Sequence, residues 1–231
     1  WTGFAIIVAG LILSYTRAAW ISVAGSFVIL ALTLLKVRFK YIALVVLIAG
    51  TYLYTQRLEI QFKLEQNRQD SSADLAEHVQ SISNITTDDS NLERMNRWAS
   101  AMRMFKEKPV FGHGPGTYMF RYAPYQLSSN KTLISTNFGD KGNAHSEYIG
   151  PLSESGVLGS ASFILIIVLS VITGFRAYRK VQEPRLKRII MAYLLGFFTY
   201  VMHGSLNNFL DTDKASALFW GFIAVLVAVD I

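Results

Sequence analysis

Long apolar runs alternate with short polar turns along this chain, and one long polar stretch interrupts them. The apolar blocks cover residues 2–15, 18–35, 41–55, 149–175, 189–210 and 215–229. A helix needs roughly 20 apolar residues to cross a bilayer, so the longer blocks are typical of membrane spans. The pattern predicts an all-α integral membrane protein with about six transmembrane helices. Because Trp1 opens directly into an apolar block, we expect a truncated first helix and a fragment of a longer protein.

The polar stretch lies between the third and fourth blocks and predicts one large, mainly helical domain over residues 57–148. Apolar side chains recur at helical spacing over residues 91–108, and Pro109 ends this helix. Ser90 and Glu93 have the spacing of a capping box at its start. Before this helix, residues 56–80 are interpreted as a helical extension of the third block and residues 81–90 as a loop. After it come a turn-rich loop over 112–116, an aromatic segment over 118–126 and a polar loop over 128–143.

The distribution of charge predicts how the blocks are oriented. Two short segments, residues 36–40 and 176–188, are strongly basic in a chain of formal net charge +6. Loops rich in Lys and Arg remain cytoplasmic, so both segments are predicted to lie in the cytoplasm. The turn at Arg17, the polar domain and the turn over residues 207–214 then share the opposite face. The predicted division is three spans in residues 1–56, the polar domain in 57–148, and three spans in 149–231.

Composition excludes several classes of protein. The chain is 52% hydrophobic and 16% charged, with a mean hydropathy of +0.31, whereas a soluble domain carries about a quarter charged residues. Its positive charge lies in short loops beside apolar blocks rather than in a surface stripe, so nucleic acid is not expected as a partner. The absence of cysteine excludes disulfides, thiolate metal sites and a cysteine nucleophile.

Three arginines on the predicted outer face are candidates for binding an anion. Arg17 lies in the first outer turn, where a guanidinium can bind phosphate bidentately or simply extend to lipid headgroups. Arg94 and Arg97 lie three residues apart on the predicted helix, and Arg94 is in its first turn, where free N–H groups favour anions. A solvated helix face is the alternative for both.

Two ionisable residues lie where the polar domain returns to the membrane. His145 is a candidate general base, since a neutral imidazole works near neutral pH; it is otherwise an ordinary loop histidine. Glu154 falls at the edge of the fourth block, where an ionisable group is unusual; it otherwise marks only a helix start.

The remaining polar motifs are less specific. Asp211 and Asp213 have the form of a metal-binding acidic pair, although a polar cap on the final turn, with His203 and Asn207 nearby, is the simpler interpretation. The glycine-rich loop over residues 112–116 could hold phosphate through backbone N–H groups. Its spacing matches no phosphate-binding loop, which favours a plain turn.

The order of these parts resembles the O-antigen ligase and polymerase superfamily. The matching pieces are the Thr16-Arg17-Ala-Ala-Trp20 turn, Arg94-x-x-x-Trp98, the loop over residues 108–116, and the segments over 145–159 and 207–213. The resemblance covers nearly the whole chain and corresponds to the C-terminal catalytic half of the family. It implies a multi-pass protein of the bacterial inner membrane with a large periplasmic loop.

The resemblance also implies a reaction, in which a glycan moves from an undecaprenyl-diphosphate carrier to an acceptor without a metal or another cofactor. Lipid A-core is the acceptor of a ligase, and another glycan repeat is that of a polymerase. By the matching motifs, the expected catalytic residues are His145, Arg17 and Arg94, in a direct, inverting transfer on the periplasmic face. The residues expected to contact substrate are Arg97, Trp98, His113, Glu154, Asn207 and Asp211.

Three alternatives remain open at this point. A polymerase needs the same donor site as a ligase and differs in its acceptor. A membrane transporter would place polar or broken helix at the bilayer midplane, whereas the ionisable residues here gather at one face. A scaffold that binds a partner through its loop would tolerate Arg→Lys substitutions, which bidentate phosphate contacts do not.

Overall fold

The computed structural model describes residues 1–56, 89–131, 135 and 142–230. The longer helices are α1 (Thr2–Leu13), α2 (Arg17–Leu34), α3 (Phe39–Thr55), α6 (Asp89–Glu107), α8 (Ile149–Lys180), α9 (Pro184–His203) and α10 (Asp213–Asp230). Short helices follow α6, namely α7 (Tyr118–Arg121), η1 (Ala123–Tyr125) and η2 (Ser128–Asn130). Every regular element in the described ranges is helical, which confirms the all-α class. Apart from Gln56, the extension predicted over residues 56–80 lies outside these ranges, and so does most of the loop predicted over 81–90.

Two predicted boundaries are wrong for identifiable reasons. The pattern predicts the fifth helix over residues 189–210, but α9 begins at Pro184, because the Glu183 carboxylate accepts from the first backbone N–H groups of the helix. Gly204 is its C-cap, and a loop connects it to α10. The second error is the capping box predicted for Ser90 and Glu93. Helix α6 begins at Asp89, and the Glu93 carboxylate accepts from Arg97 Nε at 2.8 Å.

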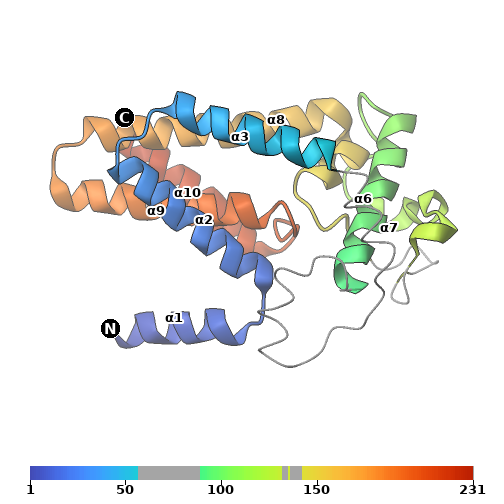
Figure 1. The fold of residues 1–231 in the computed structure, drawn as a ribbon, viewed down its shortest axis with the longest axis horizontal. Helices are drawn as coiled ribbons and strands as arrows, with labels where there is room; N and C mark the ends of the chain where they lie inside the picture. The colour runs from blue at the N-terminus through green and yellow to red at the C-terminus, as the bar shows by residue number, and fades with distance from the viewer. Residues whose placement is uncertain (57–88, 132–134, 136–141, 231) are drawn as a thin grey trace.

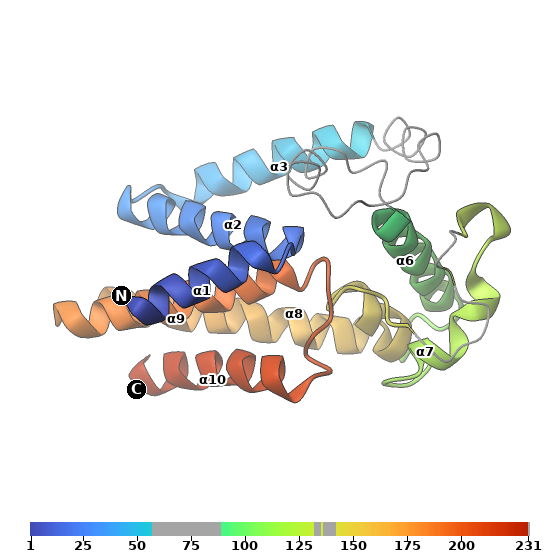
Figure 2. The same ribbon diagram turned by 90° about the horizontal axis from the view of Figure 1, so that it is seen from below.

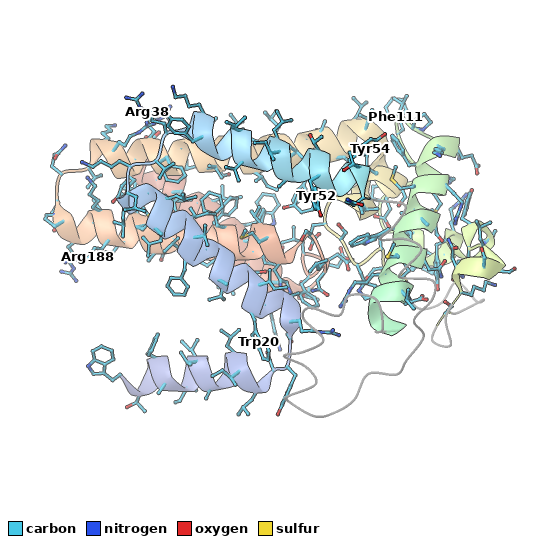
Figure 3. All side chains as sticks on the ribbon, viewed as in Figure 1. Trp20, Arg38, Tyr52, Tyr54, Phe111 and Arg188 are labelled. Atoms are coloured by element: carbon cyan, nitrogen blue, oxygen red, sulfur yellow. The ribbon has the colours of Figure 1, made fainter. Side chains whose placement is uncertain are left out.

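The described helices other than α6 and α7 run roughly along one direction, and α6 lies across one end of this bundle (Figure 1, Figure 2). The α1–α2 turn and the α9–α10 loop lie at the same end as α6. Arg38 and Arg188, from the two basic segments, both lie at the opposite end of the bundle, whereas Tyr54 and Phe111 lie toward α6 (Figure 3). The bundle therefore has the sidedness that the basic segments predict, and its orientation in a membrane stays a prediction.

Two described helices, α2 and α8, are long and apolar enough to cross a membrane by length and composition. Helix α1 is shorter, with 12 residues, and α3 has 17. Helix α10 has 18 residues but carries Asp213, Lys214 and Asp230 at its ends. Two spans are therefore supported by this criterion, and the six-span topology stays a prediction.

Large apolar side chains are exposed along the helices of the bundle, and small hydroxyl residues are buried between α2 and α9. Phe27, Leu47 and Leu169 are 63%, 67% and 52% exposed on α2, α3 and α8. Between α2 and α9, Ser26 is buried, and its Oγ lies 2.7 Å from Thr199 Oγ1. Small residues with interhelical hydroxyl contacts are typical of helix packing in lipid, and an extensive exposed apolar surface needs another apolar phase to cover it.

Helix α8 bends near its start, at Gly156, against the loop that follows α6. Gly156 has φ +65° and ψ −163°, a backbone region that is essentially restricted to glycine. A Cβ at this position would lie 2.2 Å from the Val110 carbonyl oxygen. Val157 N donates to Pro109 O at 2.8 Å, so the bend brings α8 into direct backbone contact with the loop.

Gly156→Ala is expected to lower the free energy of unfolding by at least about 2 kcal/mol, because backbone strain adds to the clash with Val110. Thermal unfolding in detergent measures the change. Gly221→Ala in α10 is the matched control, since a Cβ there meets nothing within 4 Å. An unchanged midpoint for Gly156→Ala would contradict the bend.

Candidate functional site at the α6 end of the bundle

Helix α6 carries two of the predicted arginines into different surroundings. Arg97 is only 7% exposed, its Nε donates to Glu93 Oε1 at 2.8 Å, and its guanidinium lies 5.5 Å from the centre of the Tyr122 ring. Arg94 is half-buried. Arg97 is therefore part of a charge pair inside the polar domain.

Arg97 also holds the segment that carries His145. Its Nη1 donates to the Asn143 carbonyl at 3.3 Å, and Asn143 Oδ1 accepts from the backbone N–H of His145 at 3.1 Å. Gly142 leaves the space that this contact needs, since a Cβ there would lie 2.1 Å from Arg97 Nη1. Arg97 thus supports the position of His145 from within the fold, and its contact with substrate stays a prediction.

His145 combines an unusual backbone with a cationic environment. Its φ is +47°, in the left-handed region that residues other than glycine seldom occupy, and its side chain is half-buried. Burial, and then the charges of Arg97 and Arg94, lower the pKa of His145 to about 4. The imidazole is therefore neutral at physiological pH, and one ring nitrogen can accept a proton.

Arg17 reaches the same group of side chains from the membrane bundle. It is half-buried at the first position of α2. Burial, followed by the charge of Arg17, lowers the pKa of Arg94. The charge of Arg94 in turn lowers the pKa of His145. The three residues predicted to be catalytic are therefore electrostatic neighbours, although they lie far apart in sequence. Like charges concentrated in a partly desolvated place favour an anionic ligand.

The α9–α10 loop borders this group on the side of Arg17. The His203 ring hydrogen-bonds to the backbone of Ala18, the residue after Arg17, and stacks on Phe209 with ring centres 5.4 Å apart. His203 Nε2 lies 3.3 Å from the amide nitrogen of Asn207, which is 9% exposed. Asn207 thus belongs to the contacts that hold the Arg17 turn, and its contact with substrate stays a prediction.

Glu147 connects the His145 segment to the same loop. Its buried carboxylate accepts from Tyr200 Oη at 2.7 Å and from Leu210 N at 2.8 Å, both on Oε1, and its backbone N–H donates to Gly204 O at 2.8 Å. Burial raises the pKa of Glu147, against the effect of these hydrogen bonds. Glu147 is not among the predicted site residues, and His203 is predicted only as part of the polar cap on the final turn. The sequence signal that could have identified both residues is an ionisable side chain at the edge of an apolar block.

Glu147→Ala should lower the free energy of unfolding by about 2–4 kcal/mol, because it leaves the Tyr200 hydroxyl and the Leu210 N–H without their acceptor. Glu147→Gln should retain most of the stability, since one amide oxygen can accept from both donors. Thermal unfolding of the two variants in one detergent tests the difference. Equal losses would show that the negative charge, and not the acceptor geometry, holds the loops together.

His113 lies at a different joint, where the turn over residues 112–116 meets α6 and α8. Its Nε2 lies 3.1 Å from the Met104 carbonyl, and its backbone N–H donates to Ser153 O at 3.0 Å. Met104 follows Arg94 by ten residues, which is roughly 15 Å along the helix axis. His113 is therefore placed at the far end of α6 from Arg94.

Glu154 closes the same joint from α8. Its carboxylate accepts from Gly116 N at 3.0 Å and from Tyr118 N at 2.9 Å. These contacts occupy two of the N–H groups that a phosphate could have used, which favours the plain-turn interpretation of the glycine-rich loop. The predicted substrate contacts of His113 and Glu154 stay predictions, and the structure sets both residues within this joint.

The two remaining predicted residues lie on different elements. Trp98 is half-buried on α6, and its buried Nε1 has no hydrogen-bond partner within the described part of the chain. Asp211 is exposed and accepts from Asn208 Nδ2 at 3.0 Å. Within residues 1–56, 89–131, 135 and 142–230, no group of three or more His, Asp and Glu side chains is placed to hold a metal ion.

Comparison with known proteins identifies the family. The sequence profile of a family described as O-antigen ligase matches residues 2–164, which is more than half of the chain. The chain belongs to the O-antigen ligase family. The match contains Arg17, Arg94 and His145 and extends into α8. Membership confirms the resemblance to the O-antigen ligase superfamily seen in the sequence.

A relative of this O-antigen ligase family member occurs in Haemophilus influenzae. That protein, described as uncharacterized, is 26% identical over 129 residues, which cover 55% of this chain and 31% of the relative. The chain thus spans about a third of the length of this relative. No solved structure matches the chain.

Proposed function

We propose that this chain carries the donor site and the general base of an enzyme that transfers a glycan from an undecaprenyl-diphosphate carrier to an acceptor hydroxyl. The observation that supports this is that the charge of Arg17 acts on Arg94 and the charge of Arg94 acts on His145, while α6 and the α1–α2 turn lie at one end of the bundle (Figure 1). That end lies opposite the two basic segments, so it is the periplasmic face of a bacterial inner membrane if those segments are cytoplasmic.

The two arginines are suited to a diphosphate leaving group. Negative charge on the diphosphate grows as the glycosidic bond breaks, and preorganised cations stabilise that charge in the transition state. A guanidinium binds phosphate through two parallel N–H bonds. Because Arg17 and Arg94 act on each other as like charges, an anion placed between them also relieves their repulsion. Arginine can supply this stabilisation without a metal ion.

His145 is assigned to the acceptor. The acceptor oxygen attacks the anomeric carbon as the bond from that carbon to the diphosphate oxygen breaks. The electron pair of the broken bond leaves with the diphosphate. The imidazole takes the proton of the attacking hydroxyl. A single displacement of this kind inverts the anomeric configuration. The neutral state of His145 at physiological pH supports its role as proton acceptor.

The acceptor defines the final activity, and we assign it as lipid A-core, which makes the protein an O-antigen ligase. A polymerase with the same donor site would use a growing glycan instead. Deletion of the complete gene followed by glycolipid analysis separates the two. Polymer that accumulates on the carrier while lipid A-core stays unsubstituted supports the ligase, and single repeats on lipid A-core support the polymerase. An unchanged glycolipid profile would overturn glycan transfer as the function.

A further inference from the structure

A small apolar surface lies beside the start of α8 and has no role in the proposed reaction. It consists of Val110, Phe111, Val157 and Leu158, whose exposed fractions are 48%, 76%, 48% and 52%. We refer to these four residues as the α8 collar. Val157 N donates to Pro109 O at 2.8 Å, and Gly156 lies directly against the Val110 carbonyl. The two halves of the collar are therefore held side by side by backbone contacts.

The collar is continuous with the exposed apolar face of α8. Leu158, Leu165 and Ile172 are each about half exposed and lie seven residues apart, which places them on one face of the helix. Helix α8 is one of the two described helices that are apolar and long enough to cross a membrane. The collar thus stands at the α6 end of the face that lipid would cover, and Phe111 lies at that end of the bundle in Figure 3.

Positive charge accompanies the collar. Lys106 and Lys108 are exposed and precede Val110 by four and two residues. Between them, the exposed Glu107 accepts a hydrogen bond from the Tyr125 hydroxyl, and the two lysines leave the segment with a net positive charge. Exposed apolar side chains next to lysines are typical of segments that lie in the interface of anionic bilayers.

We propose that the α8 collar is a lipid-binding surface, in which Val110 and Phe111 enter the headgroup region of the outer leaflet and Lys106 and Lys108 contact lipid phosphates. The proposal rests on the membrane assignment of α8 that the proposed function uses. This contact with lipid also fixes the position of α6 relative to the bilayer. The loop joins the end of α6, so its contact with lipid keeps α6, and with it Arg94, at a fixed height above the bilayer, where a lipid-linked diphosphate arrives.

Because the chain contains no cysteine, single labels can be placed cleanly. Phe111→Cys, Phe120→Cys and Leu165→Cys each receive an environment-sensitive fluorophore in the complete chain. The proteins are reconstituted in nanodiscs of phosphatidylethanolamine and phosphatidylglycerol that contain lipids spin-labelled at the headgroup or deep in the acyl chain. Phe120 is the matched control, because it is 68% exposed on α7 and does not belong to the collar.

The label at position 111 should be quenched several-fold more by headgroup spin labels than the label at 120, and position 165 should be quenched by deep spin labels. Lys106→Gln with Lys108→Gln should reduce quenching at 111 in discs with phosphatidylglycerol and have little effect without it. Equal quenching at 111 and 120, with 165 quenched, would overturn the collar and leave the assignment of α8 intact. A blue-shifted label at 111 without lipid quenching would also overturn it, since protein would then cover the surface. If position 165 is not quenched, the membrane assignment fails as well.

Discussion

Replacement of His145 by asparagine should lower the rate of glycan transfer by about 10²- to 10⁴-fold, which is the range for loss of a general base. Asparagine is the informative substitution, because His145 has φ +47° and asparagine adopts this conformation more readily than alanine does. Its amide cannot take the acceptor proton. The thermal midpoint and membrane insertion should stay close to those of the unmodified protein, so a loss of activity can be attributed to chemistry. Transfer at nearly the original rate would end the assignment of His145 as the base.

The pH dependence of transfer gives a second, independent readout of His145. A base works in its unprotonated form, and the pKa of His145 is about 4 in the absence of substrate. The value of kcat/KM should therefore be constant above about pH 5 and fall only at lower pH, because it reports the free enzyme. A bound diphosphate adds negative charge beside Arg94 and favours the imidazolium, so the acid limb of kcat should lie at higher pH than that of kcat/KM. An acid limb of kcat/KM near the ordinary histidine pKa would contradict the environment described here.

The helices could be predicted from the sequence because apolar runs and their polar ends are local signals. The apolar pattern does not predict the start of α9, since that start depends on the Glu183 cap and Pro184. The common location of Arg17, Arg94 and His145 followed from counting crossings between two basic segments, which needs no tertiary detail. The distances between these three residues depend on how the helices pack, which a count of membrane crossings does not give.

The parts of the site that the sequence did not predict depend on partners distant in the chain. Arg94 and Arg97 are neighbours on one helix face, and the buried arginine differs from the half-buried one by its contacts with Glu93, Asn143 and the Tyr122 ring. Glu147 acquires its role from a hydroxyl and a backbone N–H that lie 53 and 63 residues away. Contacts of this kind involve common residue types and leave no local pattern in one sequence.

Arg94→Lys should lower transfer by about 10²- to 10³-fold, the range observed when one preorganised donor to a developing anion is lost. Lysine keeps the positive charge but not the planar pair of N–H donors that matches a phosphate. The expected defect is therefore in kcat more than in KM, because the charge of the diphosphate grows in the transition state. Thermal stability should change little, since Arg94 is half-buried.

Two further Arg→Lys variants make this result specific. Arg121→Lys, at an exposed position on α7, should retain full activity and stability. Arg97→Lys should lower the thermal midpoint, because it disrupts the buried pair with Glu93 and the contact with Asn143. If Arg94→Lys behaves like Arg121→Lys, the site needs only positive charge, and a scaffold that binds an acidic partner becomes the better explanation. If Arg94→Lys loses activity but not stability, while Arg97→Lys loses both, then Arg94 contacts the leaving group and Arg97 acts through the fold.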